Sequence, residues 1–160
     1  MDAHQFLALA ESLAASAKAD PAPSNVLAMR RSAISRAYYA LFLVAPEFVD
    51  GLGIETRLVP SLHVTLEHGL RNSGVFSRGQ IANTIGFLRT ERANADYEMR
   101  RTDVETPERV DSVVESARAA ILQLDLIRAG RLSPPLDRAA VAAAILKWAG
   151  DNGKPLWRKA

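Results

Sequence analysis

Apolar residues recur along most of this chain at spacings of three and four, which is the period of an α-helix. Runs that alternate strictly between apolar and polar residues, as strands do, are missing. The first predicted helix covers about residues 2–19 and stops before Pro21. Its apolar stripe consists of Phe6, Leu9, Leu13 and Ala17. The pattern as a whole predicts an all-α protein.

The second predicted helix is apolar on more than one face, which indicates a central position in the fold. Its main stripe runs through Leu27, Arg31, Ile34, Tyr38, either Leu41 or Phe42, and Ala45. We expect this helix to end near Pro46, because proline disrupts a helix interior. Residues 47–59 contain Gly51 and Gly53 and predict a short helical turn followed by a loop.

Prolines and glycines separate four further predicted helices, at about residues 60–71, 78–99, 107–129 and 136–149. In the helix over 78–99, Arg92 falls on the apolar stripe where an apolar residue is expected. We therefore predict an up-and-down bundle of about five helices over residues 1–130. Residues 131–160 are predicted to form a short helical appendage, with Trp148 and Trp157 as packing residues.

Composition and charge exclude several classes of function. Twenty Lys and Arg against eighteen Asp and Glu give a net charge of +2, too balanced for a nucleic-acid wrapper or a polybasic anchor. The absence of cysteine excludes disulfides, thiolate metal sites and a cysteine nucleophile. No apolar run approaches the roughly 20 residues that span a bilayer, and Asp2 and Glu11 are unlike a signal peptide. A cytoplasmic protein is predicted.

Familiar cofactor and catalytic motifs are absent from the chain. Neither a glycine-rich phosphate loop nor a nucleophile elbow occurs. His63, Glu67 and His68 share a predicted helix, but the two histidines do not have the four-residue spacing of a zinc motif. We expect no cofactor and no metal.

Two segments carry a pattern that is more specific. Residues 32–42 read S-A-I-S-R-A-Y-Y-A-L-F, residues 88–97 read L-R-T-E-R-A-N-A-D-Y, and His63 lies between them. In this order they resemble the HEPN (higher eukaryotes and prokaryotes nucleotide-binding) family over residues 2–129. The resemblance implies a helical bundle that forms a homodimer, with a functional strip on its fourth helix that often lies at a two-fold interface.

The resemblance also bears on catalysis. In the ribonuclease branch of the family, an arginine is followed after four to six residues by a histidine that helps to activate the ribose 2′-hydroxyl. Arg92 matches that arginine, but Tyr97 stands at the position after a four-residue gap, and His68 is the last histidine. Because a phenol with a pKa of about 10 is a poor base at neutral pH, we expect no enzymatic activity. The alternative is a divergent, metal-independent ribonuclease toxin that uses Arg92 together with Tyr97 or with a histidine from the third predicted helix.

The residues of these segments have a structural and a functional interpretation. In the structural one, Arg36 and Asp96 form a partly buried ion pair with Tyr38, Tyr39 and Tyr97 around it. In the functional one, a ligand or partner binds at Arg89, Arg92, Asp96 and Tyr97. Charges of both signs alternate near this strip, including Glu91 beside Arg92, which predicts a solvated helix face.

By resemblance, the chain is a non-catalytic HEPN-like homodimer that binds a nucleotide, an RNA element or a cognate partner protein. Family members are often paired with minimal nucleotidyltransferases, as binding subunits or as the toxin of a bacterial toxin and antitoxin module. A purely structural interaction protein is a third interpretation, in which the Ala-rich helix near residues 139–146 docks on a partner or completes the dimer.

Overall fold

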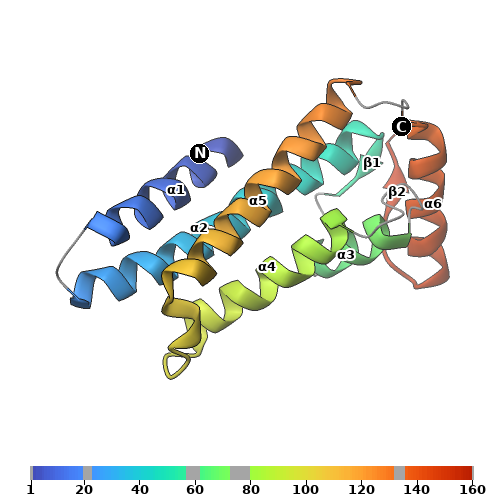
Figure 1. The fold of residues 1–160 in the computed structure, drawn as a ribbon. Coiled ribbons are helices and arrows are strands. Elements are labelled where there is room, and N and C mark those ends of the chain that lie inside the picture. The colour runs from blue at the N-terminus through green and yellow to red at the C-terminus, as the bar shows by residue number, and fades with distance from the viewer. Residues whose placement is uncertain (1, 20–22, 57–61, 73–79, 132–135, 160) are drawn as a thin grey trace. The chain divides into compact units, whose positions relative to one another are not determined.

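A computed structural model of the chain describes residues 2–19, 23–56, 62–72, 80–131 and 136–159. Within these ranges the fold is all-α, as predicted (Figure 1). Its α-helices are α1 (Ala3–Ala19), α2 (Pro23–Gly51), α3 (Leu62–Asn72), α4 (Gln80–Tyr97), α5 (Pro107–Arg128) and α6 (Arg138–Asp151). A short 3₁₀-helix, η1 (Asp103–Glu105), precedes α5. The predicted helix starts at Pro60 and Arg78 lie outside the described residues.

A small antiparallel ribbon joins β1 (Ile54–Glu55) to β2 (Trp157–Arg158). Ile54 lies opposite Arg158, and the next backbone amide, that of Lys159, donates to the carbonyl of Gly53 at 2.9 Å. The ribbon was not predicted, because two residues are too few to show an alternating pattern. It ties the C-terminal segment to the chain that follows α2.

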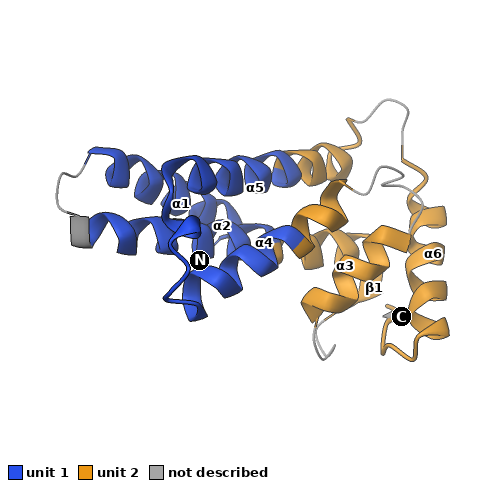
Figure 2. Cartoon of the chain, turned by 60° about the horizontal axis from the view of Figure 1, so that its bottom comes forward, with its two compact units in different colours: residues 1–41, 87–121 blue, residues 42–86, 122–160 orange. Residues whose placement is uncertain are grey.

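The chain forms two compact units, which Figure 2 shows in different colours. Unit 1 comprises residues 1–41 and 87–121, and unit 2 comprises residues 42–86 and 122–160. Helix α6 packs against α3 within unit 2. The boundary between residues 130 and 131 stays a prediction. None of the described helices is long and apolar enough to cross a membrane.

Each unit has its own apolar core. In unit 1, fully buried side chains come from α1, α2, α4, η1 and α5, and ion pairs join α1 to α5, including Lys18 with Asp111 at 2.8 Å. In unit 2 they come from α2, β1, α3, α4, α5 and α6. Large members of the two cores are Ile34, Leu41, Leu88 and Val113 in unit 1, and Phe48, Ile54, Leu70, Ile81 and Ile145 in unit 2.

The expected end of the second helix near Pro46 is wrong, since α2 continues through this proline to Gly51. An interior proline costs about 3 kcal/mol because it removes a helical hydrogen bond and crowds the preceding turn. Phe48 and Val49 lie beyond it and are each only 1% exposed. Burial of two such side chains contributes roughly 3–6 kcal/mol, which offsets the cost of the proline.

The contact between α3 and α6 positions the C-terminal helix. The Asp137 side chain caps α6 by accepting from the Ala140 amide at 3.0 Å. The Trp148 ring stacks on His68 with the ring centres 5.8 Å apart. Trp148 is therefore a packing residue, as predicted, whereas the side chain of Trp157 lies outside the described part of the structure.

Candidate binding site around Arg92

The predicted strip on the fourth helix lies in unit 1, where α4 faces α2. Arg92 and Asp96 are one turn apart on α4, and Ser35 and Tyr39 are one turn apart on α2. Together with Tyr97, the last residue of α4, these side chains form what we call the Arg92 cluster. Their spacing on two helices explains why the cluster assembles.

The Arg92 guanidinium is held on several sides. Its Nε lies 2.7 Å from Oδ2 of Asp96, and its Nη2 donates to the Tyr39 hydroxyl at 3.1 Å. The guanidinium also lies over two aromatic rings, 4.8 Å from the ring centre of Tyr97 and 5.6 Å from that of Tyr39. Burial disfavours its charge, but the side chains of Tyr97 and Asp96 outweigh this effect and raise the pKa of Arg92.

The expected ion pair between Arg36 and Asp96 is wrong. Asp96 pairs with Arg92, and its Oδ2 also accepts from the Ser35 hydroxyl at 3.3 Å. The Arg36 guanidinium instead lies over the Phe6 ring of α1, 5.8 Å from its centre. The physical reason is local: a partner one turn away on the same helix reaches Asp96 without bridging to α2.

The three tyrosines have different environments. Tyr38 is buried, and burial raises the pKa of its hydroxyl, although the nearby charges of Arg92 and Arg89 act in the opposite direction. Tyr39 is half-buried and packs edge-on against Tyr38, with ring centres 5.2 Å apart. Tyr97 is 67% exposed. Tyrosine packing is therefore centred on Arg92 rather than on Arg36, and Tyr97 faces solvent.

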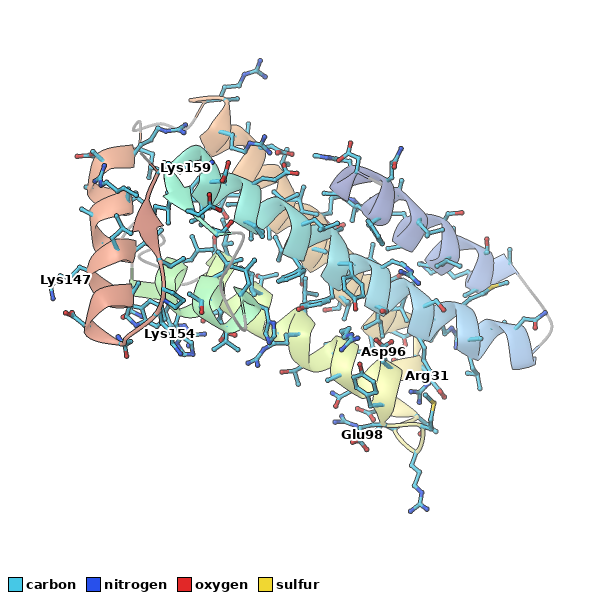
Figure 3. The ribbon with its side chains drawn as sticks, turned by 180° about the vertical axis from the view of Figure 1, so that it is seen from behind. Arg31, Asp96, Glu98, Lys147, Lys154 and Lys159 are labelled. Atoms are coloured by element: carbon cyan, nitrogen blue, oxygen red, sulfur yellow. The ribbon has the colours of Figure 1, made fainter. Side chains whose placement is uncertain are left out.

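Sequence reasoning missed the role of Arg31 on α2, whose side chain is only 11% exposed. Its Nε donates to Glu105 of η1 at 2.6 Å, and its Nη1 donates to the carbonyl of Ala95 at 2.8 Å. It also donates to the carbonyls of Asn94, Glu98, Met99 and Arg101. Figure 3 shows Arg31 and Glu98 at this end of α4. Arg31 thus fixes the end of the helix that carries Tyr97.

Glu91 was predicted on a solvated face, and this prediction is wrong. Glu91 is 2% exposed and accepts two hydrogen bonds from Arg109 of α5, at 2.7 and 2.6 Å. The Arg109 guanidinium also lies over the Phe87 ring at 5.1 Å. A bidentate pair of this kind satisfies a buried carboxylate, so Glu91 joins α4 to α5 instead of facing water.

In the part of the chain that the structure describes, the histidines are not among the partners of Arg92. In the described residues, the ion-pair, hydrogen-bond and ring partners of Arg92 are Asp96, Tyr39 and Tyr97. His4 lies beside Asp2 at the start of α1, and His63 and His68 belong to unit 2. Within the described ranges no group of three or more His, Asp or Glu residues could hold a metal ion.

Comparison with known proteins adds no further constraint. No protein-family model, curated protein or solved structure matches this chain.

Proposed function

We propose that this chain is a non-catalytic, HEPN-like module that forms a homodimer through the surface around Arg92, Tyr97 and Met99. The dimer would act as the binding subunit for a cognate protein, such as a minimal nucleotidyltransferase. The observation that carries the proposal is an exposed aromatic ring held against an immobilised arginine. Tyr97 is 67% exposed, and its ring centre lies 4.8 Å from the Arg92 guanidinium, which Asp96 and Tyr39 hold in place.

The composition of this surface supports a protein partner. Tyrosine, methionine and arginine are enriched at protein interfaces, and tyrosine and arginine are frequent among the residues that dominate binding energy. Met99, two residues after Tyr97, is 66% exposed. Asp96 neutralises Arg92, and Glu98 is exposed beside this pair, so the surface carries charges of both signs. A phosphate track would need one sign to dominate.

The same contacts support a role without catalysis. Asp96 forms an ion pair with Arg92 and accepts a hydrogen bond from the Ser35 hydroxyl, so its carboxylate is engaged in structural contacts. A general base needs to be within hydrogen-bond reach of the proton that it removes, and it needs a pKa near the working pH. The described residues of the Arg92 cluster include no histidine, which is the side chain that most often serves as a general base.

One observation favours a second candidate function, the binding of a nucleotide or a single-stranded RNA. The exposed ring of Tyr97 lies beside the Arg92 guanidinium, 4.8 Å from ring centre to guanidinium. The guanidinium could bind a phosphate while a base stacks on the exposed Tyr97 ring. This candidate uses the same residues as the dimer, so one experiment can separate the two.

Sedimentation equilibrium of the full chain, with and without a short single-stranded RNA, tests both functions. We expect a dimer that is indifferent to RNA, and we expect Tyr97→Ala and Arg92→Ala to weaken the dimer by more than about tenfold. Two matched controls should leave the dimer unchanged. Leu122→Ala removes another exposed apolar side chain, and Arg118→Ala removes an exposed, paired arginine.

Other outcomes assign the surface differently. A protein that stays monomeric at every concentration would overturn the homodimer. A dimer that keeps its affinity in both cluster variants would place the interface elsewhere. RNA binding that Arg92→Ala abolishes, with the dimer intact, would favour the second candidate function. Cleavage of the RNA that is lost in Arg92→Ala would establish the ribonuclease alternative.

A further inference from the structure

Unit 2 contains an open cleft of about 530 Å³ that the proposed function does not use. Glu47 and Asp50 line it from the last turns of α2, and Thr56 lines it just after β1. Arg128, the last residue of α5, and Arg138, the first residue of α6, complete the wall. Four elements of one unit therefore place two carboxylates, two guanidinium groups and a hydroxyl around a single space.

Each carboxylate in the cleft already has a basic partner. Glu47 accepts from Nη1 of Arg128 at 3.1 Å, and Asp50 pairs with Lys159, which Figure 3 labels in the C-terminal segment. Arg128 also lies 3.9 Å from the Asp125 carboxylate. The acidic groups that line the cleft are thus neutralised within the unit.

Arg138 is different, because its charge is not neutralised in this way. Its Nη2 donates to the backbone carbonyl of Gly51 at 2.6 Å, which fixes the guanidinium at the cleft. Among the described residues no carboxylate pairs with Arg138. The remaining donors of its planar fork can therefore meet an oxygen anion in two parallel hydrogen bonds. The Arg138 guanidinium is therefore a fixed positive charge in the cleft that can pair with the anionic group of a ligand.

We propose that this cleft binds a small organic molecule with a terminal oxyanion, which is a carboxylate or a phosphate monoester. Arg138 binds the oxyanion, and the Thr56 hydroxyl, on a residue only 5% exposed, offers a second polar contact. The volume of about 530 Å³ is in the usual range for small-molecule sites and exceeds the needs of a bare inorganic ion. The organic part of the ligand fills the rest of the cleft.

Isothermal titration calorimetry of the full chain tests the inference with three ligands of one carbon skeleton: glycerol 2-phosphate, glycerate and glycerol. Ionic strength is held constant with sodium chloride. We expect saturable binding of at least one of the two anions and none of glycerol. The affinities for glycerol 2-phosphate and glycerate are then compared, which shows whether the cleft prefers a phosphate monoester or a carboxylate.

Variants connect the binding to the cleft. Arg138→Ala should weaken binding by about tenfold or more, since it removes the charge-assisted hydrogen bonds to the oxyanion. Arg131→Ala is the matched control, because Arg131 is exposed, carries the same charge and does not line the cleft. Glu47→Gln should tighten binding by about threefold, because it removes an acidic group and releases Arg128 from its ion pair.

Arg138→Ala is expected to lower the affinity for the anion and Glu47→Gln to raise it, so a loss of folded protein cannot explain both results. A damaged fold lowers affinity in every variant, whereas Glu47→Gln is expected to raise it. Circular dichroism checks that Arg138→Ala keeps its helices. The inference is overturned if neither anion binds, if glycerol binds equally well, or if affinity is the same in wild type, Arg138→Ala and Glu47→Gln. None of these outcomes bears on the Arg92 cluster, which lies in unit 1.

Discussion

Gly86 of α4 lies so close to Glu67 of α3 that a Cβ atom at Gly86 would be 2.7 Å from Oε1 of Glu67. Glu67 is 5% exposed, and its Oε1 accepts from Nη2 of Arg71 at 3.1 Å. Arg71 also donates to Asn83 of α4 at 3.3 Å. The missing side chain at Gly86 therefore makes room for a buried carboxylate where α3 meets the start of α4.

Replacing Gly86 by alanine should destabilise the protein, although alanine is the better helix former. The added methyl group forces the Glu67 carboxylate out of a buried position, which costs about 1–3 kcal/mol as overpacking does elsewhere. Urea unfolding followed by circular dichroism measures the loss.

A control and a rescue make this prediction specific. Gly150→Ala in α6 has no atom within 4 Å of the new Cβ, so it should be neutral or slightly stabilising. Adding Glu67→Asp to Gly86→Ala shortens the carboxylate side chain, so the two losses should be less than additive. Fully additive losses would show that the two residues do not compete for space.

Arg31→Ala should be among the most destabilising substitutions in unit 1, at about 3–5 kcal/mol. It leaves the buried Glu105 carboxylate without its 2.6 Å partner and exposes the last carbonyls of α4 to a cavity. Arg31→Lys should restore little, because an ammonium cannot donate along the several directions that the guanidinium uses. Urea unfolding gives the free energies.

Arg118→Ala serves as the control for Arg31→Ala. Arg118 is also an ion-paired arginine, with Glu11 and Glu115 as partners, but its side chain is 47% exposed. Exposed pairs contribute about 0–1 kcal/mol, so this variant should unfold almost like wild type. Equal losses in the two variants would contradict the organising role of Arg31.

Arg36→Ala tests the corrected ion pairing of Asp96. A pair between Arg36 and Asp96 would make this variant strongly destabilised, whereas the contact with the Phe6 ring contributes only about 0.5–1 kcal/mol. We expect a small decrease in the melting temperature, and we expect Ser35→Ala combined with Arg36→Ala to give additive losses. A loss above about 3 kcal/mol for Arg36→Ala alone would revive the original pairing.

The sequence predicts the helices well because their apolar stripes are long, and it predicts individual side-chain partners poorly. Arg31 and Arg92 both interrupt apolar stripes, which is a readable sign that a charge is taken into the interior. The pairing of Arg92 with Asp96 was also readable, since the two residues are four apart on one helix.

Other features depend on tertiary distances that no local pattern contains. The partner of Glu91 is Arg109, 18 residues away on the next helix. Helix α2 passes Pro46 because the residues beyond it are buried, and burial is a property of the whole fold. The cleft in unit 2 likewise brings together residues from separate elements.

Tyr38 should make the protein less stable at alkaline pH. Burial raises the pKa of its hydroxyl above the ordinary value of 10.0. Below that value the folded and unfolded states both keep the proton, so Tyr38 adds no pH dependence. As the pH rises above 10.0, the Tyr38 hydroxyl of the unfolded chain loses its proton first. The free energy of unfolding then falls until the hydroxyl of the folded protein also ionises. Urea midpoints between pH 8 and about pH 11 measure the fall.

The variant Tyr38→Phe isolates this effect from that of the lysines, which titrate in the same range. The difference in unfolding free energy between wild type and Tyr38→Phe should change above about pH 10 in favour of the variant. Tyr97→Phe is the matched control, because it removes the same hydroxyl from an exposed residue. Parallel curves for all three proteins would contradict the burial effect at Tyr38.

Ile145→Ala decides whether α6 is an appendage or part of a core. Ile145 is 2% exposed, and its Cγ2 lies 3.4 Å from the position of a Cβ at Gly69 of α3. Truncating it leaves a cavity at the α3–α6 contact and should cost about 2–5 kcal/mol. Leu122→Ala, at a 58% exposed position of α5, should cost little. Tryptophan fluorescence during urea unfolding measures both, because Trp148 stacks on His68 at this contact. A dispensable appendage would leave the unfolding midpoint of Ile145→Ala unchanged.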